Sequence, residues 1–153
     1  MIGLFFEVIP RTGHADRYFE LAAGLKPELD RNGGVLFIDR YTSLDRPGVV
    51  LSHQWWESEE ALIRWRQHTQ HKAIQRAGRE QHFSDYRIRI GRATEPTETT
   101  ATARNVWVSY YESEPIARPT GELYKSVYRE GYYLVLGDSS PAITGNAADT
   151  KSF

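Results

Sequence analysis

The sequence contains no cysteine among its 153 residues, and it lacks a predominant charge of either sign. Without cysteine the chain can form no disulfide, no thiolate nucleophile and no cysteine-ligated metal or iron–sulfur site. Its 19 lysines and arginines are balanced by 20 aspartates and glutamates, so no global electric field attracts nucleic acid or an anionic membrane. We therefore expect no thiol chemistry and no nucleic-acid partner.

Long hydrophobic runs are also missing, since no apolar stretch reaches the roughly 18 residues of a membrane-spanning helix. The first segment, 1–11, is apolar but is interrupted by Glu7, and it lacks the basic start and cleavage site of a signal peptide. The motifs GxGxxG and GxSxG do not occur. The sequence thus predicts a cytoplasmic protein with no membrane partner and neither a nucleotide-binding fold nor a hydrolase fold.

What is present is a pattern of alternating strands and helices in the first 92 residues. Hydrophobic residues make up 40% of the chain, which is enough for a core. Thr12 is the expected cap of the first helix, Pro27 should break it, and Ser58 is the expected cap of the second helix, with a break at Thr69 and Gln70. The predicted strands are 2–9, 35–43, 49–56 and 83–92, and the helical regions between them are 12–32, 58–69 and 71–81.

This order, β-α-β-β-α-β, predicts an α+β, ferredoxin-like domain over residues 1–92 with an antiparallel sheet. Helices would cover one face of the sheet. The segments 2–9 and 49–56 carry large side chains on both faces, so the second face also needs a cover. We therefore expect a homodimer in which two sheets pack face to face.

The remaining residues form a predicted linker, 93–104, and a C-terminal β-rich extension, 105–153. The linker is rich in Thr, Ala, Glu and Pro, whereas 105–112 and 123–137 are rich in Val and Tyr and should be strands. We expect these strands to lie along a sheet edge, the chain's own or the partner's. No internal repeat is expected, and the tail from Asp138 onward should be frayed.

The segment 52–83 concentrates three of the four tryptophans and four of the five histidines. Trp65 follows the Ser58 cap by two turns and should face the sheet, and the helix break should let His71 turn inward. Both residues would then edge a pocket, although packing alone also explains Trp65. His68 and His71 are three residues apart, but the spacing places no third ligand, so we expect no metal site.

The plan, together with the segments WWESEEALIRWRQHTQH, AGR and DYRIRI, resembles the antibiotic biosynthesis monooxygenase family over residues 2–92. The resemblance implies a dimeric α/β barrel and one of two chemistries, cofactor-free oxidation with dioxygen or haem degradation. For haem degradation, Trp65 matches the tryptophan of the family's haem-degrading members. However, Gln75 stands where the iron-ligating histidine is expected, and Phe6 or Glu7 stands where a strand-one asparagine is expected. These departures disfavour haem.

The favoured function is therefore a cofactor-independent monooxygenase that acts with dioxygen on a small aromatic or polyketide-like molecule. His71 would be the base, with Glu7 in reserve, because a neutral imidazole with an ordinary pKa suits this role. The indole N–H of Trp65 would donate to the substrate oxygen. The alternative is a homodimer that binds a small ligand or haem, with or without degrading haem. The residues expected to bind substrate are His53, Trp55, His68 and Tyr86.

Overall fold

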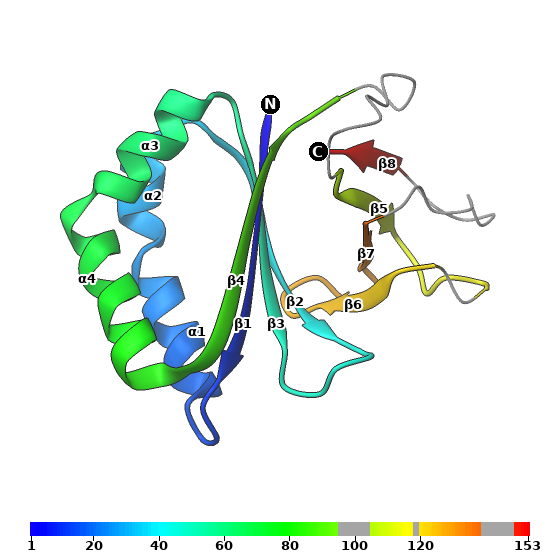
Figure 1. Cartoon of the computed structure of the whole chain (residues 1–153), viewed down its shortest axis with the longest axis horizontal. Coiled ribbons are helices and arrows are strands. Elements are labelled where there is room, and N and C mark those ends of the chain that lie inside the picture. Colours follow the sequence, from blue (N-terminus) through cyan, green and yellow to red (C-terminus); the bar gives the residue numbers. More distant parts are fainter. Residues whose placement is uncertain (95–104, 118–119, 139–148) are drawn as a thin grey trace.

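The computed structural model describes residues 1–94, 105–117, 120–138 and 149–153, and it shows a curled antiparallel sheet of eight strands with helices on one face (Figure 1). The N-terminal part confirms the ferredoxin-like order. Its elements are β1 (Ile2–Pro10), α1 (Ala15–Gly24), α2 (Lys26–Asn32), β2 (Val35–Ser43), β3 (Val50–Trp56), α3 (Glu59–Gln67), α4 (Thr69–Ala77), the π-helical turn η1 (Gly78–His82) and β4 (Phe83–Arg92).

Local sequence signals explain most of these boundaries. Pro27 lies in the first turn of α2, so the first helical region is divided between α1 and α2 as predicted. The Ser58 hydroxyl accepts a hydrogen bond from the Ala61 N–H at 3.2 Å and caps α3. The expected Thr12 cap is wrong, because α1 begins after His14 and has no side-chain cap. None of the helices in the described parts of the chain is long and apolar enough to cross a membrane.

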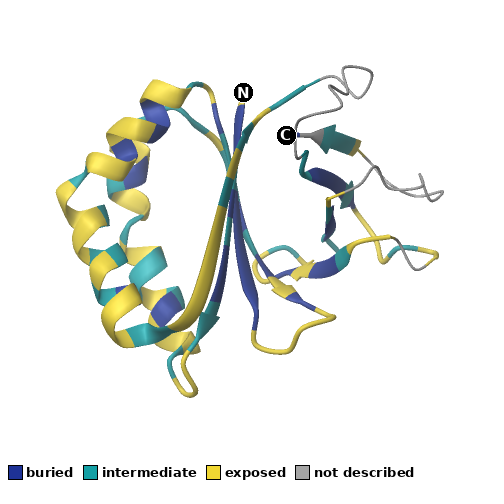
Figure 2. Cartoon of the chain, viewed as in Figure 1, coloured by how far each residue is buried: buried dark blue, intermediate teal, exposed yellow. Residues whose placement is uncertain are grey.

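The helices cover one face of the N-terminal sheet. Alternate residues of β1 and β3, including Ile2, Val8 and Trp56, point toward them because side chains alternate between the faces of a strand. Figure 2 shows β1 and β3 buried along much of their length, while β4 at the sheet edge is largely exposed. A layered α/β core results, and it frames a pocket between the helices and the sheet.

The C-terminal residues add four strands: β5 (Trp107–Tyr111), β6 (Glu122–Ser126), β7 (Tyr133–Gly137) and β8 (Asp149–Ser152). The sheet order is β4-β1-β3-β2-β6-β7-β5-β8, and β6 pairs with the β2 edge, which confirms that the extension lies along a sheet edge. The predicted strand 123–137 is two strands joined by a turn. The predicted linker lies almost entirely outside the described residues, as does 139–148.

The extension also covers the second face of the N-terminal sheet. Phe5 and Leu51 from this face pack in one core with Val108, Tyr124 and Phe153 from the extension. Phe153 is only 5% exposed, so the expectation of a frayed tail is wrong for its last residues. The chain itself therefore supplies the cover for which a second subunit was expected, which removes the physical basis of the homodimer prediction without testing the dimer.

The C-terminal strands repeat the order of the N-terminal ones. The run β6-β7-β5-β8 corresponds to β2-β3-β1-β4, and the connections between the C-terminal strands are much shorter than the helical connections of the N-terminal part. The β2–β3 and β6–β7 hairpins align without a gap at a spacing of 83 positions and share Tyr41 and Tyr124, Ser43 and Ser126, Arg46 and Arg129, Gly48 and Gly131, and Leu51 and Leu134. The expectation of no internal repeat is therefore wrong. The repeat is hard to see in the sequence because the segments between the strands are much shorter in the second copy than in the first.

Candidate functional site

A pocket of about 450 Å³ lies between the helices and the sheet. Leu4 and Phe6 of β1, Ile88 and Ile90 of β4, and Leu62 of α3 contribute to its apolar walls. Ile88 and Ile90 are 48% and 45% exposed, which is high for isoleucine in a strand. The pocket thus offers a bound molecule an apolar surface that is only partly covered by protein.

Trp65 and His71 both line this pocket and contact each other. Their rings stack with centroids 4.4 Å apart and planes 19° from parallel. Trp65 is 4% exposed and belongs to the helix-side core. The chain leaves the helix at His68, whose backbone is extended, one residue before the predicted break, and this bend lets α4 carry His71 back toward Trp65. Trp65 therefore has a packing role and a place in the pocket at once.

The hydrogen bonds of His71 fix its neutral tautomer. Its Nδ1 lies 3.0 Å from the Trp65 carbonyl oxygen, which can only accept, so Nδ1 carries the proton. Its Nε2 lies 3.2 Å from the amide nitrogen of Gln75, which can only donate, so Nε2 is the basic atom. Burial lowers the pKa of His71 to about 4, against the raising effect of the Trp65 carbonyl. His71 is therefore neutral at physiological pH, and its pKa lies below the unperturbed value of a histidine.

The positions at which the resemblance implies haem-degrading residues carry other side chains here. Gln75 occupies the position of the expected iron ligand, and its amide is hydrogen-bonded to His71, which itself lines the pocket. Phe6 lines the pocket, whereas Glu7 points to the other face of the sheet. Across the described ranges of the chain, no group of three or more His, Asp or Glu side chains could hold a metal ion.

Two further predicted residues lie near the Trp65–His71 pair. Tyr86 of β4 lines the pocket and is 43% exposed. His68 stacks on Trp65 with ring centroids 5.6 Å apart, but it does not line the pocket and its Nε2 lies 3.4 Å from Glu28. Tyr86 can therefore touch a bound molecule, while His68 contacts the site through Trp65.

His53 and Trp55 lie on the opposite face of the sheet. His53 is fully buried, with Nδ1 3.1 Å from the Leu4 carbonyl oxygen and Nε2 2.7 Å from the Tyr110 hydroxyl. The Trp55 indole nitrogen lies 2.9 Å from the same Nε2. Burial lowers the pKa of His53 to about 3. The structure thus places both residues in the core against the extension, away from the pocket where they were expected to bind substrate.

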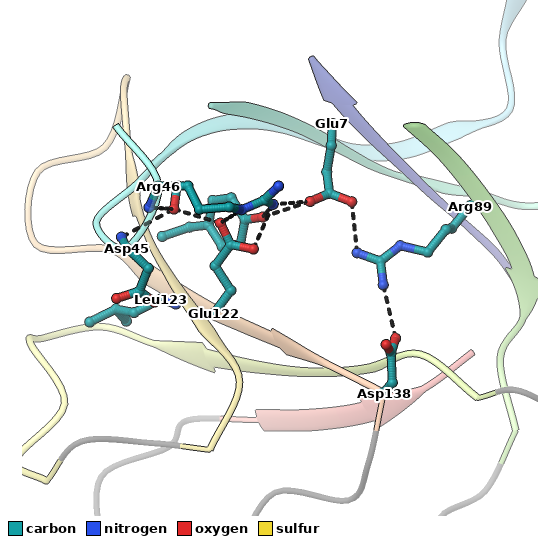
Figure 3. A network of polar contacts seen from close by, with 9 residues as sticks. Glu7, Asp45, Arg46, Arg89, Glu122, Leu123 and Asp138 are labelled. Atoms are coloured by element: carbon teal, nitrogen blue, oxygen red, sulfur yellow. Dashed lines mark hydrogen bonds and ion pairs between the residues drawn. The ribbon is translucent and has the colours of Figure 1, made fainter. Parts of the chain in front are cut away.

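Glu7 is also on this second face, where it joins the two halves of the chain (Figure 3). Its carboxylate is ion-paired with Arg46, accepts a hydrogen bond from the Tyr124 hydroxyl at 3.0 Å and pairs with Arg89 at 3.0 Å. Arg46 also pairs with Glu122 at 2.6 Å. A carboxylate with three donors is occupied with structure, so the geometry separates Glu7 from the substrate pocket and from the reserve role expected for it.

Several polar residues of the pocket were missed by the sequence analysis, and three of them interact at one end of it: Tyr18 of α1, Arg40 of β2, and Tyr128 of the connection between β6 and β7. Arg40 could have been found from the sequence, because it lies two residues after Ile38 and therefore on the same face of the strand as this apolar side chain. Tyr18 lies on the apolar face of the first predicted helix, so the pattern indicates packing and gives no sign of a pocket. The position of Tyr128 could not be predicted, because it depends on the pairing of β6 with β2. That pairing brings the turn between β6 and β7 to this end of the pocket.

Comparison with known proteins gives a consistent result. A family model described as antibiotic biosynthesis monooxygenase matches residues 1–77. A Pyricularia oryzae protein named jasmonate monooxygenase is 34% identical over 116 residues, which are 76% of this chain and 54% of that protein. An uncharacterised Bacillus subtilis protein, YqjZ, is 30% identical over 59 residues, 39% of this chain and 50% of that protein. The chain thus spans about half the length of these relatives.

Solved structures share the fold. A Deinococcus radiodurans protein with a provisional antibiotic biosynthesis monooxygenase name has a TM-score of 0.56 at 17% identity, over 65% of this chain and 99% of that chain. A Mycobacterium tuberculosis protein has a TM-score of 0.55 at 15% identity, over 61% and 95% of the two chains. These structures match most of their own length to little more than half of this chain.

Proposed function

Because the chain belongs to the antibiotic biosynthesis monooxygenase family, we propose that it oxidises a small aromatic or polyketide-like molecule with dioxygen in the pocket between helices and sheet. The observation that carries this proposal is the stacked Trp65–His71 pair, in which a neutral histidine meets an apolar pocket. The name of the Pyricularia oryzae relative supports monooxygenation as the reaction type. We do not assign the substrate of that relative to this chain, because the match covers only about half of that protein.

The proposed reaction needs no external reductant. A phenol and dioxygen together contain the atoms of a quinone and one water, so the substrate itself supplies all the electrons. His71 Nε2 takes the phenolic proton, and the resulting electron-rich anion reacts with oxygen. The Trp65 indole nitrogen has no hydrogen-bond partner within the described part of the chain and is available to the substrate oxygen. The apolar walls reduce the contact of water with the bound substrate, although the pocket is open along β4.

An oxygen electrode tests this proposal. Purified protein is mixed with hydroquinones and anthrones, and oxygen uptake is compared for the wild type, His71→Ala and the control His14→Gln. His14 contacts His82 and does not line the pocket. We expect substrate-dependent uptake that falls about 10²-fold in His71→Ala, the usual scale for a lost general base, and persists in the control.

Ligand-dependent thermal stabilisation without oxygen uptake would instead support the non-catalytic reading, and a Soret band on titration with haem would support the haem reading. Uptake that is unchanged in His71→Ala would remove the assigned base. The predicted cytoplasmic location and homodimer are not tested by the structure.

A further inference from the structure

The pocket has a marked charge asymmetry. Its lining includes four cationic side chains, Lys26, Arg40, Arg66 and Arg79, but no aspartate or glutamate. The whole chain, in contrast, has a formal charge of −1. Lys26 is paired with Asp30 at 2.9 Å on the exposed side of α2. The remaining positive charges favour a ligand that is apolar in its body and anionic at one point.

Arg40 is the cation of this set that belongs to the sheet. It is half-buried on β2, and its Nε is buried without a hydrogen-bond partner. Within the described ranges it forms no ion pair, whereas Arg46, Arg89 and Arg129 all pair with carboxylates. A half-buried guanidinium with an unsatisfied Nε and no paired carboxylate is costly, so an anion that hydrogen-bonds to it would offset part of that cost.

Two phenols accompany Arg40 at this end of the pocket. Tyr18 of α1 is 6% exposed; burial raises the pKa of its hydroxyl, and the charge of adjacent Arg40 opposes that rise. Tyr128 enters from the C-terminal half and also lines the pocket. The three side chains come from α1, β2 and the β6–β7 connection, so one guanidinium and two hydroxyl donors converge from three separate elements.

We propose that Arg40 binds the carboxylate of an apolar organic acid, with Tyr18 and Tyr128 as flanking hydroxyl donors and the hydrocarbon body against Leu4, Phe6 and Ile88. The planar guanidinium presents two parallel N–H donors, which match the two oxygens of a carboxylate. This proposal rests on the proposed function in assigning the pocket to the substrate, and it adds the substrate's chemical class. It concerns binding alone and involves no chemical step.

Calorimetric titration with 1-naphthylacetic acid and its neutral analogue 2-(1-naphthyl)ethanol tests the carboxylate site. The wild type should bind the acid at least tenfold more tightly than the alcohol at pH 7.5. Arg40→Gln should abolish that preference while it changes alcohol binding less than twofold. Arg64→Gln is the matched control, because Arg64 is exposed on α3 and does not line the pocket, and it should keep the preference.

Equal binding of acid and alcohol by the wild type would overturn the carboxylate proposal without any variant, as would a preference that survives in Arg40→Gln. If Arg40→Gln does not fold, Arg40→Lys provides the comparison, since it keeps the charge, loses the fork and should retain only part of the preference. Acid-selective binding without any oxygen uptake would leave this proposal standing and remove the proposed reaction.

An independent observation concerns the junction between the two halves, where several contacts occur twice at equivalent positions. The Ser43 hydroxyl donates to Glu122 at 2.6 Å and accepts from the Arg46 N–H at 2.9 Å. At the equivalent positions, the Ser126 hydroxyl donates to Asp39 at 2.9 Å and accepts from the Arg129 N–H at 3.0 Å. Arg46 and Arg129 likewise contact the other half's tyrosine hydroxyl, at 3.2 Å and 3.0 Å.

Backbone hydrogen bonds between the two halves also occur in equivalent pairs. The Leu44 N–H donates to the Leu123 carbonyl and the Val127 N–H donates to the Arg40 carbonyl, both at 2.8 Å. The β2–β6 pairing is centred on Thr42 opposite Lys125, and these two residues are themselves equivalent, 83 positions apart. Reciprocal contacts about a pair of equivalent residues are the pattern of a two-fold, self-complementary interface.

We infer that the single chain contains both halves of a two-fold assembly, in which strands β5 to β8 are a second copy of strands β1 to β4. No second subunit is then needed to cover the sheet. Light scattering coupled to size-exclusion chromatography at micromolar protein concentration should give the chain mass of 17.6 kDa. A mass of twice that value would overturn the inference.

Matched substitutions test the two-fold relation separately from the mass. Ser43→Ala and Ser126→Ala each remove one hydroxyl that bridges the halves, so both should lower the melting temperature by similar amounts. Both variants should remain monomeric. A loss of stability in only one of the two would show that the serines are not equivalent and would contradict the two-fold relation.

Discussion

His71 is held neutral by burial and by the direction of its two hydrogen bonds, and this determines its pH response as a base. Its pKa is lowered to about 4, so the basic form is present throughout the neutral range. We expect kcat/KM to be independent of His71 protonation from pH 7 down to about 5 and to fall only near pH 4. A pH–rate profile with an acid limb near 6.5, the unperturbed value for histidine, would contradict this assignment.

Trp65 combines a buried ring with an indole N–H, and the two can be separated by substitution. Trp65→Phe keeps an aromatic ring against His71 but loses the donor. We expect kcat/KM to fall by about 10- to 100-fold, which corresponds to about 1–3 kcal/mol of transition-state stabilisation. The melting temperature, followed by circular dichroism, should change much less than in Trp65→Ala. An unaltered kcat/KM would leave Trp65 with packing alone.

Sequence reasoning found some of these residues because it followed periodicity. The spacing from Ser58 and the helix break correctly predicted that Trp65 and His71 meet at a pocket. The alternation of side chains along β1 also predicts that Glu7 lies on the opposite face from Leu4 and Phe6, and therefore away from the pocket. The lowered pKa of His71 could not be predicted, because it depends on burial between α3, α4 and the sheet.

Among the elements, β8 is followed by Phe153, whose side chain packs in the core. The Phe153 ring packs edge-on against Phe5 at 5.4 Å, and the two residues beneath it, Gly3 and Gly91, leave room that a Cβ atom would fill. We expect Phe153→Ala to lower the free energy of unfolding by about 3 kcal/mol, the scale for removing a buried aromatic ring. Urea denaturation measures this. A change below about 1 kcal/mol would show that the ring is not part of the cooperative core.

The elements were predictable where a local signal marks them. Pro27 divides α1 from α2, and the turn before Gly48 separates β2 from β3. The turn before Gly131 carries a similar signal, with φ of 78° against 83° at Gly48, but it was absorbed into one long strand. The π-helical turn η1 could not be predicted, because no residue pattern distinguishes it from the end of an α-helix.

At the scale of the whole molecule, the two buried histidines make stability depend on acid. Burial lowers the pKa of His53 to about 3 and of His71 to about 4, whereas the unfolded chain binds these protons near 6.5. The unfolded state therefore takes up more protons as the pH falls below 6.5, and the free energy of unfolding should decrease from there toward pH 4. Above 6.5 this contribution should be constant.

Urea denaturation at pH 7.5, 5.5 and 4.5 checks the acid dependence. Carboxylates add to this decrease only at the acid end of the window. Burial would raise the pKa of Glu122, but hydrogen bonds from Arg46 and Ser43 lower it below its usual 4.5, so its stabilising contribution begins to be lost near pH 4.5, whereas the histidine effect begins near 6.5. The variant His53→Gln should flatten the curve. Equal stability at pH 7.5 and 4.5 in the wild type would mean that neither histidine is held neutral in the folded protein.

The short connections of the second copy determine how many ligands one molecule can bind. A dimer of complete units would present two equivalent pockets, and occupation of one could alter the affinity of the other. Here the β5–β6 and β7–β8 connections are much shorter than the segments that carry α1 to α4 in the first copy, so we expect the proposed reaction to have one site per chain. Saturation should follow a simple hyperbola with a Hill coefficient of about 1.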